Sequence, residues 1–110
     1  MTTIFDVIAD PTRRRILDLL CQRRHSVGEL VDALDISQPG VSKQLRLLRE
    51  AGLVYVEQEA QLRWYHLNPE PLKELDSWLE AYRNLWSDRY SRLDAYLQTF
   101  QTQEKENDNE

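Results

Sequence analysis

Apolar residues recur at helical spacing through the first half of the chain and predict four helices there. A short apolar face around Ile4 and Phe5 predicts the first helix. Asp10 followed by Pro11 is typical of a helix start, so we expect a second helix that runs to about Gln22. Its isoleucine and leucines, spaced three and four residues apart, would face the core.

Two further helices are predicted from their capping residues. Ser26 and Glu29 have the spacing of a capping box, with the serine before the helix and the glutamate three residues later. Ser37 is a suitable N-cap for the next helix, which carries Pro39 in its first turn. That helix is expected to end near residue 51, because Gly52 readily adopts the left-handed conformation of a helix C-terminus.

The spacing of apolar residues changes after Gly52 and predicts a β-hairpin. The stretches LVYVEQ (53–58) and RWYHL (63–67) are short and rich in aromatic and β-branched residues, as strands are. The residues between them contain no Asn-Gly or Asp-Gly pair. We therefore expect a connection that is longer or looser than a two-residue turn.

One long helix is predicted from Pro69 to about residue 100. Leucine and aromatic residues recur at seven-residue steps from Leu72, and a second apolar stripe runs beside them. Thirty-odd helical residues span about 45 Å, more than so small a domain can cover, and a second copy of the chain is the simplest partner. The expected dimer contacts in this helix are Leu79, Tyr82, Trp86, Leu93, Tyr96 and Leu97.

Together these elements predict a mostly α fold with a small β-hairpin, in the order α-α-α-α-β-β-α. We expect a single domain over residues 1–100, made of a body (3–68) and a long dimerisation helix (69–100). The polar residues 101–110 are expected to form a disordered tail.

Charge is unevenly distributed along the 110 residues, whose net charge is −5. Residues 1–68 carry nine basic and nine acidic side chains, whereas residues 69–110 carry five basic and ten acidic ones. A distant acidic segment hardly screens a basic helix, so the acidic total does not exclude a polyanionic partner. The chain has no apolar run of the ~18 residues that a membrane span needs, and its single cysteine, Cys21, fits the reducing cytoplasm.

The helix predicted over residues 38–50 is basic on its outer side. Valine and leucine residues form its inner face, whereas the outer arc carries Ser42, Lys43, Arg46 and Arg49, with no acid before Glu50. Hydroxyl, amide and guanidinium groups bind phosphate oxygens and base edges. A short helix and a turn before this helix, and a hairpin after it, predict a helix-turn-helix with a wing.

Three stretches resemble the ArsR family of winged helix-turn-helix repressors: IADPTRRRILDLL (8–20), VGELVDALDISQPGVSKQLRLLREAGLV (27–54) and RWYHLNPEPL (63–72). The resemblance covers about residues 3–100. It implies a homodimer joined through the first and last helices, which adds Ile4 and Phe5 to the expected dimer contacts. A dyad-symmetric operator and repression of transcription are implied as well. It also implies DNA contacts at Ser37, Gln38, Ser42, Lys43, Gln44 and Arg46 in the helix, and at Gln61 and Arg63 in the wing.

Many members of this family sense metals, but the ligands expected for such a site are missing from this sequence. Ser26 and Gly28 stand where a Cys-x-Cys pair would lie, and no histidine follows His66. Cys21 and His25 offer two ligands, which are too few for a tight zinc site. We expect a buried cysteine, a surface histidine, and neither a metal nor another cofactor.

Arg13, Arg14 and Arg15 stand in the first turns of the second helix, where cations oppose the helix dipole. An interaction that offsets this unfavourable electrostatic energy is therefore expected. Ion pairs with the aspartates at positions 6, 10 and 18 and contact with DNA phosphates both remain open.

The sequence therefore predicts a transcriptional repressor that binds a palindromic operator as a homodimer, without a metal, and with regulation of its own operon as an option. One alternative is release by an unidentified inducer, which could be a small molecule, a thiol oxidant at Cys21 or a metal. Another is a winged helix that binds protein or RNA. The sequence contains no phosphate-binding loop, nucleophile elbow or metalloprotease motif, so no enzyme is expected.

Overall fold

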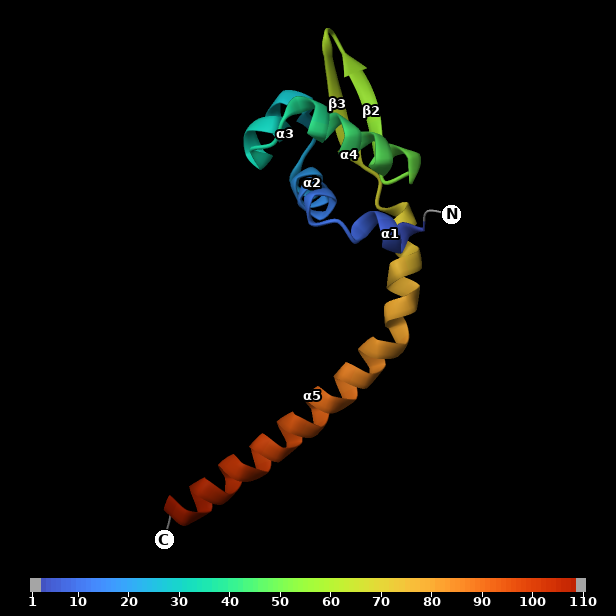
Figure 1. Cartoon of the computed structure of the whole chain (residues 1–110). Helices are drawn as coiled ribbons and strands as arrows, with labels where there is room; N and C mark the ends of the chain where they lie inside the picture. The colour runs from blue at the N-terminus through green and yellow to red at the C-terminus, as the bar shows by residue number, and fades with distance from the viewer. Residues whose placement is uncertain (1–2, 109–110) are drawn as a thin grey trace. The chain divides into compact units, whose positions relative to one another are not determined.

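The computed structural model describes the backbone of residues 3–108, with the side chains of residues 3–89 and 92–98. The chain folds in the predicted order of four helices, a hairpin and a long helix (Figure 1), with a two-residue strand and a 3₁₀ turn added. The elements are α1 (Ile4–Ile8), α2 (Pro11–Gln22), β1 (His25–Ser26), α3 (Val27–Leu34), α4 (Gln38–Glu50), β2 (Val54–Glu59), β3 (Leu62–Leu67), η1 (Glu70–Leu72) and α5 (Lys73–Asp108).

The predicted N-caps are confirmed, because each places a side-chain oxygen on an otherwise unpaired backbone N–H group. Asp10 accepts from the backbone N–H of Arg13 at 3.1 Å. Ser26 and Glu29 form a reciprocal capping box. Ser37 accepts from the backbone N–H of residue 40 at 3.2 Å. α1 has a second capping box, which Thr3 forms with Asp6, the third helical residue. It was not predicted from the sequence.

α4 ends in a Schellman motif centred on Gly52, whose φ of 79° lies in the left-handed region. The N–H of Leu53 donates to the carbonyl of Leu48, and the N–H of Gly52 donates to that of Arg49, each at 3.0 Å. The Asn68 side chain donates to the Gly52 carbonyl at 2.9 Å, and its backbone N–H donates to the Leu53 carbonyl at 2.8 Å. The end of α4 is thereby hydrogen-bonded to the end of β3.

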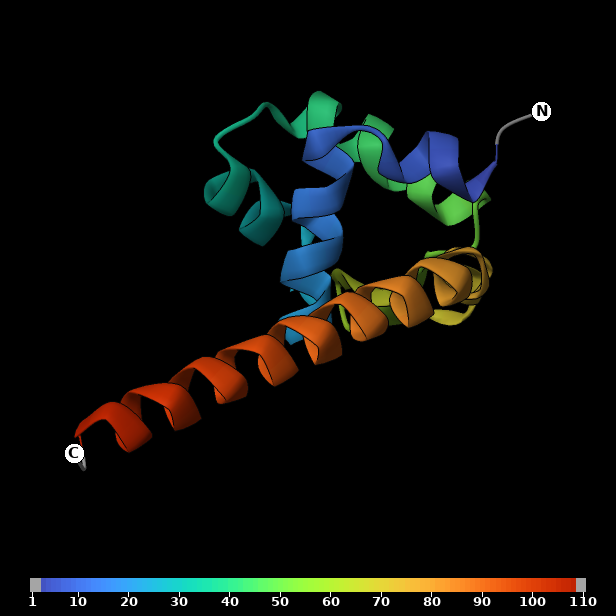
Figure 2. The same ribbon diagram turned by 90° about the horizontal axis from the view of Figure 1, so that it is seen from below.

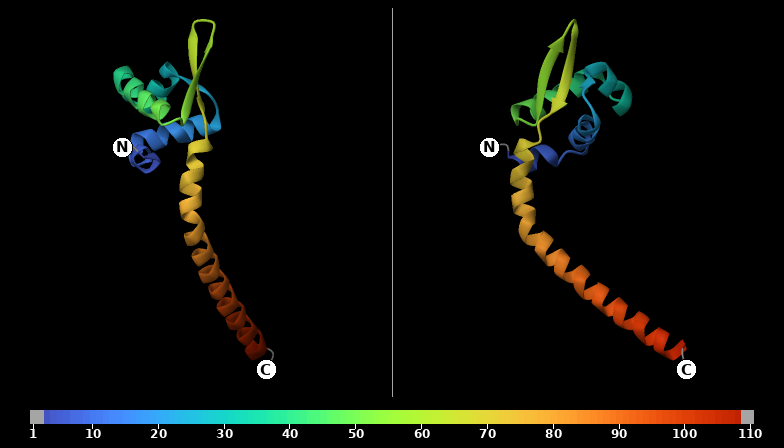
Figure 3. Two further views of the ribbon diagram at one scale, coloured as in Figure 1. Left: turned by 90° about the vertical axis from the view of Figure 1, so that its right-hand side faces the viewer. Right: turned by 180° about the vertical axis from the view of Figure 1, so that it is seen from behind.

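The hairpin belongs to a three-stranded antiparallel sheet in the order β1-β3-β2. β2 and β3 project beyond the helices (Figure 3). Their pairing runs from Val54 opposite Leu67 to Glu59 opposite Leu62, which leaves a two-residue turn. The expectation of a longer connection was wrong, because Ala60 adopts a φ of 57° that glycine or asparagine more often supplies.

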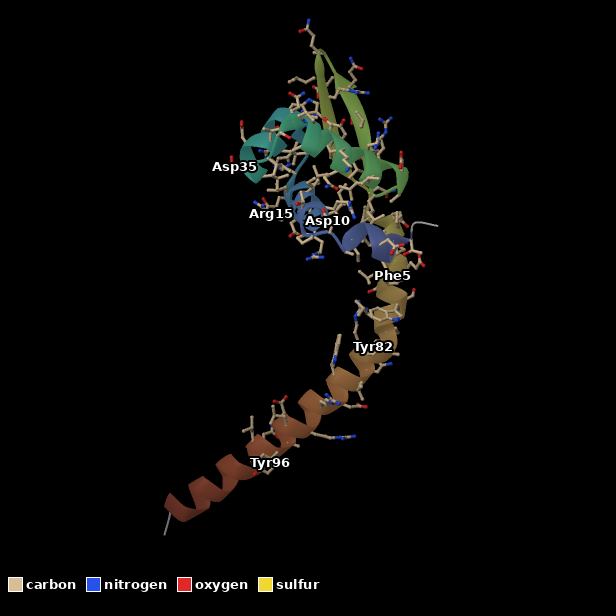
Figure 4. The ribbon with its side chains drawn as sticks, in the orientation of Figure 1. Phe5, Asp10, Arg15, Asp35, Tyr82 and Tyr96 are labelled. Carbon is tan, nitrogen blue, oxygen red and sulfur yellow. The ribbon has the colours of Figure 1, made fainter. Side chains whose placement is uncertain are left out.

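A single apolar core holds the first four helices and the sheet together. Its fully buried members are Ile16, Leu30, Val41, Leu45, Leu48 and Leu53. Ile4, which was assigned to the dimer interface from the sequence, is instead buried in this core, because α1 turns Ile4 and Val7 toward α2. Phe5 is on the outer side of α1, with 37% of its surface exposed (Figure 4).

The chain divides into two compact units between Leu75 and Asp76, beyond the body boundary expected at residue 68. The second unit is the remainder of α5, whose backbone stays helical to Asp108 rather than to about residue 100. Residues 101–108 contain neither proline nor glycine to stop a helix. The assignment of this unit to dimerisation, and of residues 101–110 to a disordered tail, stays a prediction.

Between Asp76 and Gln98, α5 carries a large exposed apolar face. At 100° per residue, the large apolar side chains of this face fall within a sector of roughly 120° around the helix axis. Trp78, Tyr82 and Trp86 also contact one another along the helix, with ring centroids 5.2 and 6.3 Å apart. Exposed members of the face are Trp78, Tyr82, Leu85, Trp86, Leu93, Tyr96 and Leu97, while Leu79 is half-buried. In the described part of the chain, no helix has the apolar length that a bilayer crossing requires.

Candidate nucleic-acid interface

The helix α4 has a buried face and a basic exposed face, as its sequence predicts. Val41, Leu45 and Leu48 are at most 1% exposed. The side chains on the opposite side, which include Lys43 and Arg46, are exposed. Among the described residues neither cation has an ion-pair partner. Both charges are therefore available to an outside ligand. Exposed members of this face, called the α4 basic face below, are Gln38, Ser42, Lys43, Arg46 and Arg49.

α3 and the turn after it set the position of α4. Asp35 ends α3 in the left-handed conformation, with φ 55° and ψ 43°, and its N–H donates to the Val31 carbonyl at 3.0 Å. Asp35 lies at the outer end of α3 (Figure 4). Only Ile36 and Ser37 then separate this residue from α4. The two helices and their short connection have the layout of a helix-turn-helix.

The first turn of α4 has few backbone N–H groups free to bind an anion. Ser37 caps the N–H of Gly40, and Pro39 has no N–H to donate. Of the first three helical residues, only Gln38 keeps a free backbone donor for a phosphate. The exposed Ser37 hydroxyl accepts in its cap, so its own hydrogen remains available for donation.

Gln44, a predicted DNA contact, also has a partner within the protein. It is half-buried, and its Oε1 accepts a hydrogen bond of 2.9 Å from Nη1 of Arg13 on α2. The sequence places Gln44 at the flank of the basic face, but it gives no sign of a partner that is 31 residues away. The amide is therefore held at the edge of the face by the body of the protein.

The wing carries its two predicted contact residues on the outside. Gln61 is exposed at the tip, and Arg63 is exposed on β3, opposite Gln58. The carboxylates of β2 lie beside groups of the protein itself. Glu59 pairs with Arg24 at 2.7 Å, and Glu57 lies 3.3 Å from Nε2 of His66. Among the described residues Arg63 has no ion-pair partner, so it too is available to an anion.

Two roles were left open for the three consecutive arginines of α2, and among the described residues none of them forms an ion pair with aspartate. Arg13 donates to the carbonyls of Val7 and Asp6, at 2.5 and 3.3 Å. Arg14 donates to the carbonyls of residues 8 and 9, at 2.9 and 3.0 Å. Two guanidinium groups thus satisfy the free carbonyls at the C-terminal end of α1, where a cation is favourable. Arg15 is exposed on α2 (Figure 4).

The expected burial of Cys21 and His25 is reversed. α2 ends at Gln22, so the two residues do not share a helix face. Cys21 is exposed, because the inward positions of α2 are those of its isoleucine and leucines. His25 is 5% exposed in β1, and its Nδ1 lies 2.9 Å from the Arg23 carbonyl, which requires a protonated Nδ1.

Metal-ligating side chains are not grouped in the described part of the chain, where no three of His, Cys, Asp and Glu lie close enough to hold one ion. Ser26 stands at one of the two positions where a Cys-x-Cys pair would lie, and its hydroxyl caps α3. The absence of a metal site stays a prediction.

In the view of Figure 2, α1 lies in front of α4. Residues of these helices and of α2 line a cleft of about 200 Å³. Its lining includes Asp6, Arg13, Leu47 and Glu50. Pockets for small molecules usually exceed 300 Å³, so its size does not favour an inducer site.

Known proteins share this arrangement. Residues 10–56 match the family described as bacterial regulatory protein, arsR family. The transcriptional repressor SdpR of Bacillus subtilis is 33% identical over 84 residues, which are 76% of this chain and 93% of that protein. The arsenic resistance transcriptional regulator ArsR1 of Pseudomonas putida is 37% identical over 79 residues, 71% of this chain and 62% of that one.

Solved structures agree with these relatives. The crystal structure of an ArsR family transcriptional regulator superposes with a TM-score of 0.65 at 30% identity, covering 76% of this chain and 87% of that one. Reduced HlyU of Vibrio cholerae gives a TM-score of 0.60 at 34% identity, covering 72% of this chain and 83% of that one. These relatives are regulators of transcription rather than enzymes. The chain belongs to the ArsR family of bacterial transcriptional regulators, with the winged helix-turn-helix fold of that family.

Proposed function

We propose that this protein is a sequence-specific DNA-binding repressor that acts as a homodimer on a palindromic operator. The observation that carries the proposal is the α4 basic face. Its cations have no acidic partner among the described residues, although the whole chain is acidic. In a helix-turn-helix the second helix enters the major groove, where such side chains meet base edges and phosphates.

The wing extends this contact beyond the major groove. Gln61 at its tip and Arg63 on β3 are exposed and would meet the adjacent backbone or the minor groove. With Ser37, Gln38, Ser42, Lys43, Gln44 and Arg46, they make up the proposed DNA contacts.

The apolar face of α5 supports the homodimer. Seven large apolar side chains between Trp78 and Leu97 are 43–62% exposed, which is typical of a surface covered by another protein. A second copy of the chain would cover this face and present two α4 helices, one to each half-site about 34 Å apart. The direction of regulation is proposed from SdpR, which is named a transcriptional repressor. HlyU of Vibrio cholerae, which is also similar to this chain, is named a transcriptional activator.

Metal independence and control of the protein's own operon complete the proposal. Ser26 and Gly28 supply no thiolate where a sensor pair would lie. Such a repressor would work in the cytoplasm and bind the promoter of its own gene. An inducer that acts through the exposed Cys21 is the second candidate, since a thiol oxidant could reach this side chain.

The test measures binding of the full-length chain to duplexes selected from a randomised library, and to the promoter of its own gene, over a range of salt concentrations. We expect a palindromic preference and a steep fall of log K with log salt. Arg46→Ala should weaken binding by tenfold or more and relax the preference. Arg63→Ala should weaken binding to all duplex sequences by about the same factor. Lys73→Ala, remote from α4 in the chain, is the charge-matched control.

Two results would overturn the proposal. One is a wild-type protein that enriches no duplex sequence, or that binds RNA with the same affinity and salt dependence. The other is unchanged binding by Arg46→Ala and Lys43→Ala variants that keep the wild-type circular dichroism spectrum. A chelator that abolishes binding would refute metal independence alone.

A further inference from the structure

Arg13 makes three hydrogen bonds that join α1, α2 and α4. Its Nε and Nη2 donate to the carbonyls of Val7 and Asp6 at the end of α1. Its Nη1 donates to Oε1 of Gln44, at 2.9 Å. The carboxylate of Asp6 is not part of this network, since it accepts from the backbone and hydroxyl of Thr3. Two bonds to carbonyls of α1 therefore hold the guanidinium group in place, and its third bond goes to Gln44.

The chemistry of arginine decides which way the Gln44 amide points. A guanidinium group is only a donor, so the amide must present its oxygen to Arg13. In the planar amide, the oxygen, the NH₂ nitrogen and Cγ are about 120° apart around the carbonyl carbon Cδ, so the oxygen and the NH₂ group point in different directions. An amide whose oxygen faces α2 therefore directs its NH₂ group away from α2.

This orientation limits what Gln44 can read. A free glutamine pairs with adenine through both groups, because its oxygen accepts from N6 while its nitrogen donates to N7. The Gln44 oxygen keeps a second lone pair, but its bond to Arg13 directs it toward α2. The two N–H donors are then the groups that Gln44 can turn toward DNA. Those donors suit acceptors, namely O6 and N7 of guanine, O4 of thymine or a phosphate oxygen.

We propose that Arg13 is a positioning residue that fixes the Gln44 amide, so that this point of α4 offers hydrogens to DNA and disfavours the two-bond contact with adenine. The inference rests on the proposed function, because it assumes that α4 meets a duplex. It deepens that function by assigning specificity to a residue of α2 that itself need not touch DNA.

The chain supplies a matched control. Arg14 follows Arg13 in α2 and also donates to the terminal carbonyls of α1, at 2.9 and 3.0 Å, but it has no bond to α4. Arg14→Met should reproduce any loss of capping at α1. Only Arg13→Met should release Gln44.

The first measurement needs no DNA. In ¹H–¹⁵N spectra of the free protein, the side-chain NH₂ signals of Gln44 should shift and sharpen in Arg13→Met and stay in place in Arg14→Met. Identical Gln44 signals in the wild type and in a folded Arg13→Met variant would overturn the proposal. Should Arg13→Met lose helicity, Arg13→Lys serves in its place, because an ammonium group cannot make all three bonds at once.

The second measurement selects duplexes from a randomised library with the wild type and each variant. Arg13→Met should gain tolerance for adenine at one position of each half-site, a change of roughly tenfold or more in relative enrichment. Arg14→Met should keep the wild-type preference. Gln44→Glu, which retains an acceptor for Arg13 but loses both donors, should lose binding by tenfold or more while keeping its thermal stability.

The outcomes separate this inference from the proposed function. Failure of the wild type to enrich any sequence refutes the proposed function, and the inference with it. A wild type that enriches a palindrome, with the same profile for folded Arg13→Met, overturns the inference alone. A shared change in the Arg13→Met and Arg14→Met profiles also overturns it, since capping of α1 would then be the cause.

Discussion

Arg24 lies over the indole ring of Trp64, with its Cζ 4.2 Å from the ring centroid. The same guanidinium group pairs with Glu59 at 2.7 Å, near the tip of the hairpin. One side chain from the segment between α2 and β1 therefore contacts both strands of the wing. A cation over an indole face and an exposed ion pair each contribute about 0.5–1 kcal/mol.

Arg24→Ala should loosen the wing while leaving α4 in place. We expect a loss of about 1 kcal/mol in the free energy of unfolding, with faster hydrogen exchange at the β3 amides. Arg23→Ala is the control, because Arg23 pairs with Glu29 at 2.9 Å and has no recorded contact with the hairpin. Equal exchange at β3 in the two variants would show that Arg24 does not hold the wing.

Leu93→Glu should prevent dimerisation. Leu93 is 52% exposed on the apolar face of α5, and a carboxylate there would be desolvated in any paired state. Asn84 lies nine residues earlier, or 180° around the helix, so Asn84→Glu adds the same charge to the opposite side. Light scattering at micromolar concentration should give a monomer for Leu93→Glu and a dimer for Asn84→Glu and the wild type. A monomeric wild type would contradict the dimer proposal itself.

Gly52→Ala should destabilise the body through its backbone alone. An added Cβ would lie 3.6 Å from Cγ of Pro71, an ordinary contact, whereas the φ of 79° disfavours any residue with a side chain. The cost is about 1–2 kcal/mol, which lowers the melting temperature by several degrees in a domain of this size. Gly28→Ala should have the opposite sign, because Gly28 is helical and its Cβ would meet nothing closer than 3.9 Å.

Glu29 should make stability depend on pH in the acid range. Its hydrogen bond with Arg23, and then that with the Ser26 backbone, lower the pKa of the Glu29 carboxyl below its ordinary value. A carboxyl whose pKa falls on folding stabilises the protein above its unfolded pKa, and this stabilisation is lost as the pH falls through the folded pKa.

Glu29→Gln keeps the capping geometry but removes the charge. The wild type should melt higher than the variant at pH 7, and the difference should vanish at a pH below the folded pKa of Glu29. Melting curves from pH 7 to pH 3 give the comparison. A difference that does not change with pH would exclude the Arg23–Glu29 pair as its origin.

The local features of the fold were predictable because short-range chemistry determines them. Ser26, Ser37 and Asp10 cap helices through hydrogen bonds to residues three positions away, so the sequence alone displays both partners. Gly52 marks the end of α4 for the same reason. The fold and the family could be predicted because such signals agree with one another.

Features that depend on distant partners were missed. The strand β1 exists only because His25 and Ser26 pair with Tyr65 and Trp64. The tight turn at Ala60 requires the pairing of β2 and β3 to impose a positive φ on alanine. No residue pattern within either segment indicates these effects.

In the candidate site, too, local features could be predicted and those that depend on distant partners could not. Exposure of Lys43 and Arg46 follows from helical periodicity, whereas the inward bond of Gln44 depends on Arg13, 31 residues earlier. The reversed burial of Cys21 and His25 has a simple cause. Cys21 lies on the outer side of α2, whose inward positions are taken by isoleucine and leucines, and His25 lies beyond the end of α2, in β1.

The hydrogen bonds of Asn68 to the end of α4 bear on how the protein would choose among DNA sequences. These bonds connect α4 to the hairpin and oppose independent movement of the two elements. In the proposed complex, a mismatch in groove width would then be met by deformation of the duplex, at an energy that varies with base-pair stacking. Base steps that no side chain reaches would then still influence affinity, through their ease of bending.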